Sequence, residues 1–437
     1  MSGTELAILM FVVLLAMIAL RMPIAIALFA VGAIGMVQLT SLDQLLIWLE
    51  AAPVGRTASY SLSVIPLFVL MGQLAMHSGL SSVLFRSART WVGHRPGGMA
   101  VATIGGCAAF GAICGSSLAT GATMASVSLP EMKKLGYSGA LSTGSLAAGG
   151  TLGILIPPSI ILVIYAIITE QSIGDLFLAA VFPGIIATFY YVISVWVFVR
   201  FRPEAGPAGE RYGWRERLES LKYVWPVAVI FLLVIGGIYR GIFTPTEGAA
   251  VGAAATGVIA LFRRMSWDQF TTALIETAKT TGMIYLILIG AEIYGSFMAL
   301  SELPLRIAGM VSGLELTPLA VIALILVIYI LLGAVMDGLA MILITVPVFL
   351  PIVLGLDLGM SEEAKAIWFG ILVLSVVETG LITPPVGLNC YVINSLAEDV
   401  SLIETFKGVT PFVISDFFRL ATIVGFPAVA LWAPGLL

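Results

Sequence analysis

The chain has 437 residues, of which 59% are hydrophobic and only 11% are charged. Soluble domains carry roughly 25% charged residues, so this composition excludes a soluble enzyme and a nucleic-acid-binding protein. Long uncharged runs cross a bilayer as helices, and the sequence therefore predicts an all-α polytopic membrane protein with the lipid bilayer as its surroundings. The net charge of −4 is too small to indicate a partner.

The sequence predicts no cofactor, no enzymatic activity and no metal other than a coupling ion. Three cysteines in apolar segments and only two histidines are too few for a site built from soft ligands. No lysine follows a glycine, so the phosphate-binding motif GxxxxGK[ST] is missing and ATP cannot be hydrolysed by this chain alone. A membrane protease is disfavoured because Ser116 and Ser117 have no histidine or lysine base nearby. Any transport must then be driven by a gradient.

Ordinary apolar spans and shorter amphipathic segments follow one another along the chain. The spans are predicted at about 6–20, 22–39, 62–76, 176–199, 224–239, 249–262, 283–300 and 409–432. The first is expected to be a retained helix, because Glu5 stands where a secretion signal has a basic head. The amphipathic segments, which we expect along the membrane surface, are 43–52, 80–91 and 267–279.

Two longer apolar segments, at about 98–132 and 318–354, are each interrupted in the middle. The first break is Gly115-Ser116-Ser117, and the second runs from 333 to 338 and contains Asp337. Roughly 15 apolar residues on either side of a break are too few to cross comfortably. Each segment is therefore predicted to be a re-entrant helical hairpin that enters and leaves on the same face.

Two further spans, at about 138–169 and 363–397, contain a proline pair, Pro157-Pro158 and Pro384-Pro385. A proline pair removes two backbone donors and disfavours helix at the residue before it. Both spans are therefore predicted to be discontinuous helices.

The halves on either side of a polar segment repeat each other in order, which indicates a duplication. We predict a first repeat at 1–200, a cytoplasmic linker at 201–222 and a second repeat at 223–437. Basic residues, including Lys133 and Lys134, gather in the loops of one face, which the positive-inside rule makes cytoplasmic, with both termini outside. An odd number of crossings in each half makes the repeats inverted, with discontinuous helices that meet near the midplane.

Hairpin tips and unwound helices leave carbonyl groups without partners, and such oxygens suit a hard cation such as Na⁺. The predicted cation-binding residues are Gly115, Ser116, Ser117, Thr151, Gly153 and Pro157 in the first half, and Gly333, Asp337, Thr379, Gly380, Thr383 and Pro384 in the second. The predicted substrate-binding residues are Ser117, Thr120, Ser159 and Asn389. The alternative is that these glycines and prolines only permit close packing and kinks.

Acidic residues inside spans are functional candidates, because an unpaired carboxylate in the membrane is costly. Asp337, at a hairpin tip, is the first candidate, and Glu378, which borders an unwound loop, is the second. Asp416 is expected to pair with Arg419 three residues later, and Glu247 to cap a helix start.

Several motifs together resemble a known family. The sequences IPLF at 65–68, GSSLAT at 115–120, GIFTPTE at 241–247 and TPPVGLN at 383–389 are similar to the large membrane (M, DctM-like) subunit of tripartite ATP-independent periplasmic (TRAP) transporters, within the ion-transporter superfamily. The resemblance runs from Arg21 to the C-terminus and implies an elevator-type importer of organic acid anions in the bacterial inner membrane, with Na⁺ as the coupling ion. It also implies two partners, a small four-helix membrane subunit and a soluble periplasmic substrate-binding protein.

The alternative function is a stand-alone Na⁺/dicarboxylate symporter of the same superfamily. The chain lacks the Ser-Asn-Thr tip motif of those proteins, which counts against this alternative. Transport by the chain alone would distinguish the two. Nothing in the sequence identifies which organic acid is carried.

Overall fold

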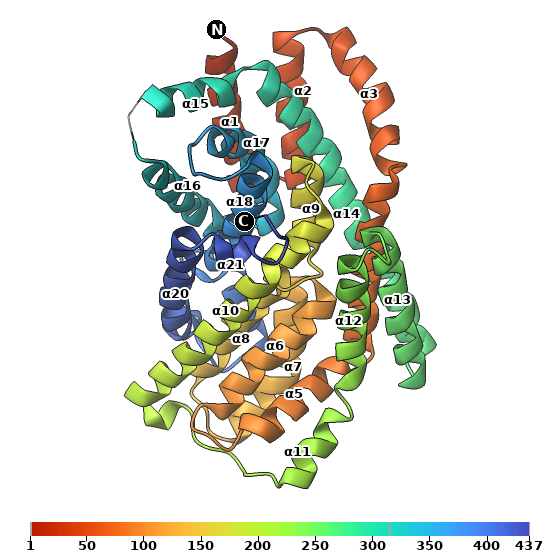
Figure 1. Cartoon of the computed structure of the whole chain (residues 1–437), viewed down its shortest axis with the longest axis vertical. Coiled ribbons are helices and arrows are strands. Elements are labelled where there is room, and N and C mark those ends of the chain that lie inside the picture. The colour runs from red at the N-terminus through yellow and green to blue at the C-terminus, as the bar shows by residue number, and fades with distance from the viewer. Residues whose placement is uncertain (1, 314–315, 437) are drawn as a thin grey trace.

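All secondary structure in residues 2–313 and 316–436, the part of the chain that the structure describes, is helical. The computed structural model places these helices in one elongated bundle (Figure 1). Within the described residues, six helices are long and apolar enough to cross a membrane, or up to eight if each of two bent pairs counts as one span. The predicted all-α polytopic membrane fold is confirmed.

The helices that precede the first hairpin agree with the predicted segments to within a few residues. They are α1 (Gly3–Ala19), α2 (Ile24–Leu39), α3 (Leu42–Thr57), α4 (Val64–His77) and α5 (Leu80–Val92). Local side chains fix their ends: Ser2 and Glu5 form a capping box at the start of α1, because each side chain bonds the other residue's backbone N–H.

The helices of the first half end and restart close to the predicted interruptions. The first hairpin consists of α6 (Gly98–Cys114) and α7 (Ser117–Lys134), which pack against each other across a two-residue turn. The first discontinuous helix consists of α8 (Gly139–Leu155) and α9 (Ile160–Thr169), which are bent by 41° at the proline pair. The half ends with the long helix α10 (Ile173–Phe201).

The segment between the halves is bound to the first half. A short 3-10 helix, η2 (Pro203–Ala205), is followed by α11 (Trp214–Leu221) and α12 (Trp225–Tyr239). The amides of Gly97 and Ser138 donate to the carbonyls of Gly206 and Ala205, each at 2.9 Å. The predicted linker is therefore attached beside the starts of α6 and α8.

The second half contains the same order of elements. Its helices are α12, α13 (Pro245–Phe262), α14 (Trp267–Leu300), α15 (Leu303–Gly313), α16 (Pro318–Gly333), α17 (Gly338–Leu354), α18 (Glu362–Ile382), α19 (Leu388–Leu396), α20 (Leu402–Gly425) and α21 (Ala428–Leu431). A hairpin (α16 and α17), a discontinuous helix (α18 and α19) and a long helix (α20) therefore recur in sequence. The inversion of one half relative to the other stays a prediction.

One predicted boundary in the second half is wrong. The sequence predicted an amphipathic segment at 267–279 and a distinct span at 283–300, but α14 is one continuous helix of 34 residues. No proline lies between Lys279 and Met283, so every residue there keeps its backbone donor and the helix continues. The predicted cap at Glu247 is confirmed: the Glu247 amide donates to Thr244 Oγ1 at 3.3 Å, and Glu247 Oε2 accepts from the Thr244 amide at 2.8 Å.

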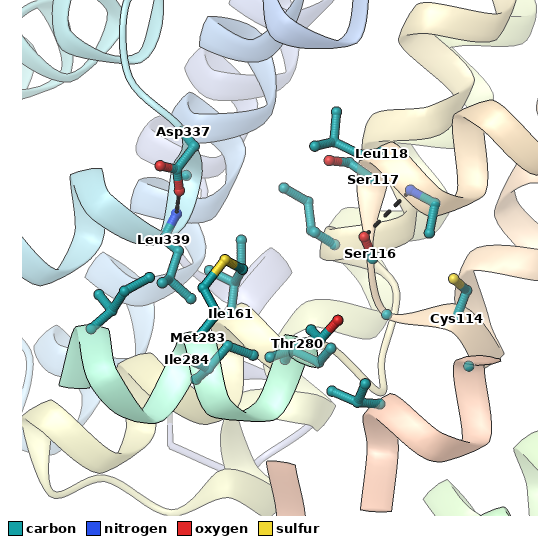
Figure 2. A pocket seen from close by; sticks show the side chains of 18 of the residues that line it. Cys114, Ser116, Ser117, Leu118, Ile161, Thr280, Met283, Ile284, Asp337 and Leu339 are labelled. Atoms are coloured by element: carbon teal, nitrogen blue, oxygen red, sulfur yellow. Dashed lines mark hydrogen bonds between the residues drawn. The ribbon is translucent and has the colours of Figure 1, made fainter. Parts of the chain in front are cut away.

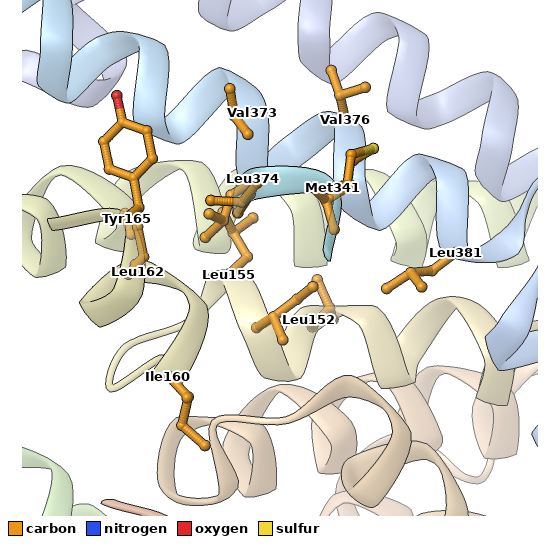
Figure 3. Close-up of a cluster of buried hydrophobic side chains, with 14 of the residues drawn as sticks. Leu152, Leu155, Ile160, Leu162, Tyr165, Met341, Val373, Leu374, Val376 and Leu381 are labelled. Atoms are coloured by element: carbon orange, nitrogen blue, oxygen red, sulfur yellow. The ribbon is translucent and has the colours of Figure 1, made fainter. Parts of the chain in front are cut away.

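The two discontinuous helices form the centre of the bundle. All of α8 after Gly139 and all of α18 after Glu363 are buried. Leu152 and Leu155 of α8 lie opposite Leu374 and Leu381 of α18, with Met341 of α17 beside them (Figure 3). Such apolar contacts hold the halves together. The first proline pair, Pro157-Pro158, is buried, whereas Pro384 and Pro385 of the second break are exposed.

Candidate functional site

A cavity of about 630 Å³ lies between the two hairpin tips and helices α2, α4 and α14 (Figure 2). Ser116 and Ser117 line it from the first tip, and Asp337 lines it from the second. Thr280 and Met283 contribute from α14. The cavity thus joins the two halves of the chain at the points where their hairpins turn.

The first tip presents the N-terminus of α7, which carries no charged side chain in its first turns, to the cavity. Gly115 ends α6 in the left-handed region (φ 65°), which glycine adopts without strain. Ser116 is the N-cap of α7, and its hydroxyl accepts from the amide of Ala119 at 3.4 Å. The N-terminus of a helix carries partial positive charge and exposes amide groups, so this tip favours an anion.

The second tip carries a carboxylate. Asp337 is the N-cap of α17, where its Oδ1 accepts from the amides of Leu339 at 3.0 Å and Ala340 at 3.1 Å. These two amides are the donors that a carboxylate inside the membrane requires, and the second carboxylate oxygen, Oδ2, makes neither of these bonds. Among the described lining residues, Asp337 is the only Asp, Glu, Lys, Arg or His. Its charge makes this side of the cavity favourable for a cation.

Two buried oxygen atoms near the first tip have no donor among the described residues, and the Ser116 carbonyl lies beside one of them; we call these three oxygens the oxygen cluster behind the first tip. Thr120 Oγ1 and Asn389 Oδ1 are buried and have no hydrogen-bond partner in the described part of the chain. A Cβ on Gly153 would lie 2.6 Å from Thr120 Oγ1 and 2.8 Å from the Ser116 carbonyl oxygen. Asn389 Nδ2 donates to the Ala147 carbonyl at 3.2 Å, which fixes the amide beside α8. Buried oxygens without donors are costly, and a hard cation satisfies them.

This arrangement changes the role of three predicted substrate-binding residues. Ser117 lines the cavity, whereas Thr120, Ser159 and Asn389 are absent from the described lining. Thr120 and Asn389 belong to the oxygen cluster behind the first tip. Ser159 is the N-cap of α9, where its hydroxyl accepts from the amide of Leu162 at 3.3 Å.

Two further predicted cation-binding residues of the first half, Thr151 and Pro157, lie apart from the oxygen cluster. Thr151 is buried on α8, where its Oγ1 donates to the Ala148 carbonyl at 2.8 Å and contacts Tyr191 Oη at 3.2 Å. Pro157 lines a second, apolar cavity together with Phe231 of α12. The structure therefore groups Ser116, Gly153 and Thr120, and keeps Pro157 apart from the main cavity.

In the second half the predicted residues meet mainly through backbone contacts. A Cβ on Gly380 would lie 2.7 Å from Gly333 Cα, so these glycines allow the hairpin and the discontinuous helix to touch. Thr379 Oγ1 donates to the Ser375 carbonyl at 2.9 Å, and Thr383 Oγ1 donates to the Thr379 carbonyl at 2.6 Å. The close-packing alternative thus holds for the two glycines. Pro384 follows directly in the break.

A buried ionic cluster lies beside the second break. Arg419 Nη1 donates to Glu378 Oε2 at 2.6 Å, and Arg419 Nη2 lies 3.1 Å from Asp416 Oδ1. The predicted pairing of Asp416 with Arg419 is confirmed. Glu378, the second functional candidate, is inside α18 close to the break, fully buried and ion-paired. No local signal reveals this pair, because its members are 41 residues apart.

Comparisons with known proteins agree on one family. The family described as tripartite ATP-independent periplasmic transporter, DctM component, matches residues 11–429. The C4-dicarboxylate TRAP transporter large permease protein DctM of Pseudomonas aeruginosa is 36% identical over 381 residues, covering 86% of this chain and 87% of that protein. The sialic acid TRAP transporter permease protein SiaT of Haemophilus influenzae is 30% identical, covering 87% of this chain and 60% of that longer protein. In fold, the chain resembles the YdaH transporter of Alcanivorax borkumensis, with a TM-score of 0.66, 15% identity and coverage of 99% and 100% of the two chains.

Proposed function

The chain belongs to the DctM family of TRAP transporter large permease subunits, and we propose that it imports an organic acid anion by secondary transport coupled to Na⁺. Members of this family are transporter permeases and not enzymes, and their names include carriers of dicarboxylates and sialic acid. That the anion is an organic acid, that the coupling ion is Na⁺ and that partner proteins take part are all elements of this proposal.

The observation that supports anion transport best is the cavity between the hairpin tips. The start of α7 offers amide groups of an uncharged helix end, with Ser116 and Ser117 beside them. These groups can bind a carboxylate without a basic side chain. Apolar residues such as Met283 and Ile284 on α14 would contact the carbon skeleton.

Coupling to Na⁺ is supported by the oxygen cluster behind the same tip. Thr120 Oγ1, Asn389 Oδ1 and the Ser116 carbonyl oxygen could coordinate Na⁺, with the backbone of Gly153 beside them. An ion held there would fix the turn at Ser116 and thereby orient the amides of α7 toward the anion. Linkage then requires that the anion also strengthens Na⁺ binding.

We assign a second cation position to the side of the cavity that carries Asp337, near Thr379, Thr383 and the second break. The Asp337 carboxylate would attract the ion, while Thr379 in the last turn of α18 and Thr383 at the start of the unwound segment would offer oxygens. A cation there would also offset the repulsion between Asp337 and an incoming anion.

The same arrangement of helices supports proposals for how the transporter moves and for the partners with which it assembles. The cavity separates the hairpins and discontinuous helices from α2, α4 and α14, which supports an elevator in which the first group moves against the second. The words "periplasmic" and "large permease" in the family names support a bacterial inner-membrane location, a small membrane subunit and a periplasmic substrate-binding protein.

Uptake by the complete transporter tests this function. Proteoliposomes would contain this chain with its small subunit, the binding protein would be added outside, and a C4-dicarboxylate and sialic acid would serve as first probes. Uptake should require Na⁺ and should not require ATP. Equal uptake after Na⁺ is replaced by K⁺ would contradict the coupling, and uptake by the chain alone would favour a stand-alone symporter.

A further inference from the structure

Two buried residues occupy equivalent positions in the discontinuous helices. Thr151 on α8 lies six residues before Pro157, and Glu378 on α18 lies six residues before Pro384. Each therefore lies about one helical turn before its break. Any movement of either unwound segment must shift the turn that carries one of these residues.

A continuous chain of polar contacts joins these two positions. Thr151 Oγ1 lies 3.2 Å from Tyr191 Oη, and Tyr191 Oη donates to Asp416 Oδ2 at 3.0 Å. Asp416 Oδ1 lies 3.1 Å from Arg419 Nη2, and Arg419 Nη1 donates to Glu378 Oε2 at 2.6 Å. We call these five residues the inter-break chain. It passes from α8 through α10 and α20 to α18.

The inter-break chain has little freedom to rearrange. None of its side chains is more than 1% exposed, so water cannot replace a broken contact. The Tyr191 ring packs edge-on against Phe412 at 5.5 Å, and Arg419 Nη2 also donates to the Ser375 carbonyl at 3.1 Å. Because an unpaired charge or hydroxyl in such surroundings is costly, the contacts form or break together.

The direct contact between the two helices is of a different kind. Where α8 and α18 face each other, the side chains are apolar, including Leu152, Leu155 and Leu374 (Figure 3). Apolar contacts are non-directional and tolerate small sliding motions. The directional connection between the two breaks is therefore the inter-break chain.

Given the Na⁺ coupling proposed above, we propose that Tyr191, Asp416 and Arg419 are positioning residues that make cation binding at the two breaks cooperative. A cation at the first break would fix the end of α8, and hence the position of Thr151. The inter-break chain would then hold Glu378 and the end of α18 in the geometry that binds the second cation. By linkage, binding at the second break would strengthen binding at the first by the same factor.

The test removes one hydroxyl from the inter-break chain. Tyr191→Phe keeps the ring against Phe412 and breaks the contacts to Thr151 and Asp416. Tyr190→Phe is the matched control, because it also removes a hydroxyl that joins α10 to α20, through Thr422 at 3.0 Å, outside the inter-break chain. The readout is the melting temperature of the purified chain in increasing Na⁺, with K⁺ replacing Na⁺ at constant ionic strength.

We expect the parent and Tyr190→Phe to be stabilised along a sigmoidal Na⁺ curve. The Tyr191→Phe curve should lose its sigmoidal shape. Its half-saturating Na⁺ concentration should be at least about 5-fold higher than that of the parent, because coupling between two sites typically changes affinity by about 5-fold or more. Superimposed curves for Tyr191→Phe and Tyr190→Phe would overturn the proposal. Absence of any Na⁺ effect on the parent would instead contradict the Na⁺ coupling of the proposed function.

Melting temperatures without Na⁺ show whether each variant is folded. Should Tyr191→Phe not fold, Asp416→Asn replaces it, since the asparagine retains an oxygen for the Tyr191 hydroxyl and loses the charge opposite Arg419. The same flattened Na⁺ curve is expected for Asp416→Asn. A sigmoidal curve with the parent's midpoint in that variant would also overturn the cooperative role.

Discussion

Arg419 and Glu378 form an ion pair at 2.6 Å between α20 and α18, and neither side chain has any exposed surface. Asp416 provides a second carboxylate at 3.1 Å from the same guanidinium. One positive group thus partners two negative ones inside the bundle. Removal of that group leaves both carboxylates without their cation.

We therefore predict unequal effects of substitutions in this cluster. Arg419→Met should destabilise the protein by roughly 3–5 kcal/mol, the range for a broken buried ion pair. Glu378→Gln should cost less, because its amide oxygen can still accept from Arg419 and the pair with Asp416 remains. Thermal unfolding of both purified variants in detergent checks this order. Equal melting temperatures for the two would contradict it.

A second prediction concerns the oxygen cluster behind the first tip. Thr120→Val removes a buried hydroxyl that has no partner, so without Na⁺ the variant should melt at the parent's temperature or above. If Thr120 Oγ1 is a ligand, the half-saturating Na⁺ concentration for stabilisation should rise roughly tenfold, as for loss of one contact to a charged group.

Thr103→Val is the matched control for Thr120→Val. Thr103 is buried in the same hairpin, but its hydroxyl donates to the Met99 carbonyl at 2.9 Å. This control should melt lower without Na⁺ and keep the parent's Na⁺ midpoint. A shift of the midpoint in Thr103→Val, or none in Thr120→Val, would show that Thr120 does not hold the ion.

The sequence predicted the features of this fold that depend on local chemistry. The proline pairs at 157–158 and 384–385 remove donors within the chain itself, so both helix breaks could be placed within a few residues. The turn at Gly115 and Ser116 was predictable because small and polar residues interrupt an apolar segment there. The unbroken α14 was missed, because a polar stretch changes amphipathicity without removing any backbone donor.

The roles of individual side chains depend on tertiary contacts and were harder to predict. Asn389 lies in the second half and yet donates to Ala147 of α8, which no local pattern reveals. Glu378 was expected to border an unwound loop, but its ion pair with the distant Arg419 was not predicted. Asp337 was predicted as a functional candidate at a hairpin tip, and its additional role as the N-cap of α17 was not anticipated.

The orientation of the chain gives a third prediction. Because basic residues gather in the loops of one face, we predict that Lys134 is cytoplasmic and that Glu362 is outside. Both side chains are exposed, and the three native cysteines are buried. An impermeant thiol reagent added outside intact cells should label a cysteine at 362 and not one at 134. Labelling of position 134 from outside would contradict this orientation.

The last prediction separates two roles of Asp337, helix cap and cation ligand. Asn and Asp are similarly good N-caps, so Asp337→Asn should keep the bonds from Leu339 and Ala340 and leave stability nearly unchanged. The charge is lost, however, and the half-saturating Na⁺ concentration for uptake should rise roughly tenfold.

Asp337→Ala provides the contrast, because it removes the cap together with the charge. It should lower stability by about 1 kcal/mol and raise the Na⁺ requirement as much as Asp337→Asn does. Melting temperatures and Na⁺ titrations of uptake, measured on the same preparations, distinguish the two effects. If the Na⁺ curve of Asp337→Asn superimposes on that of the parent, Asp337 acts as a cap alone. The cation at the second tip would then depend on the oxygens of the unwound segment that contains Thr383.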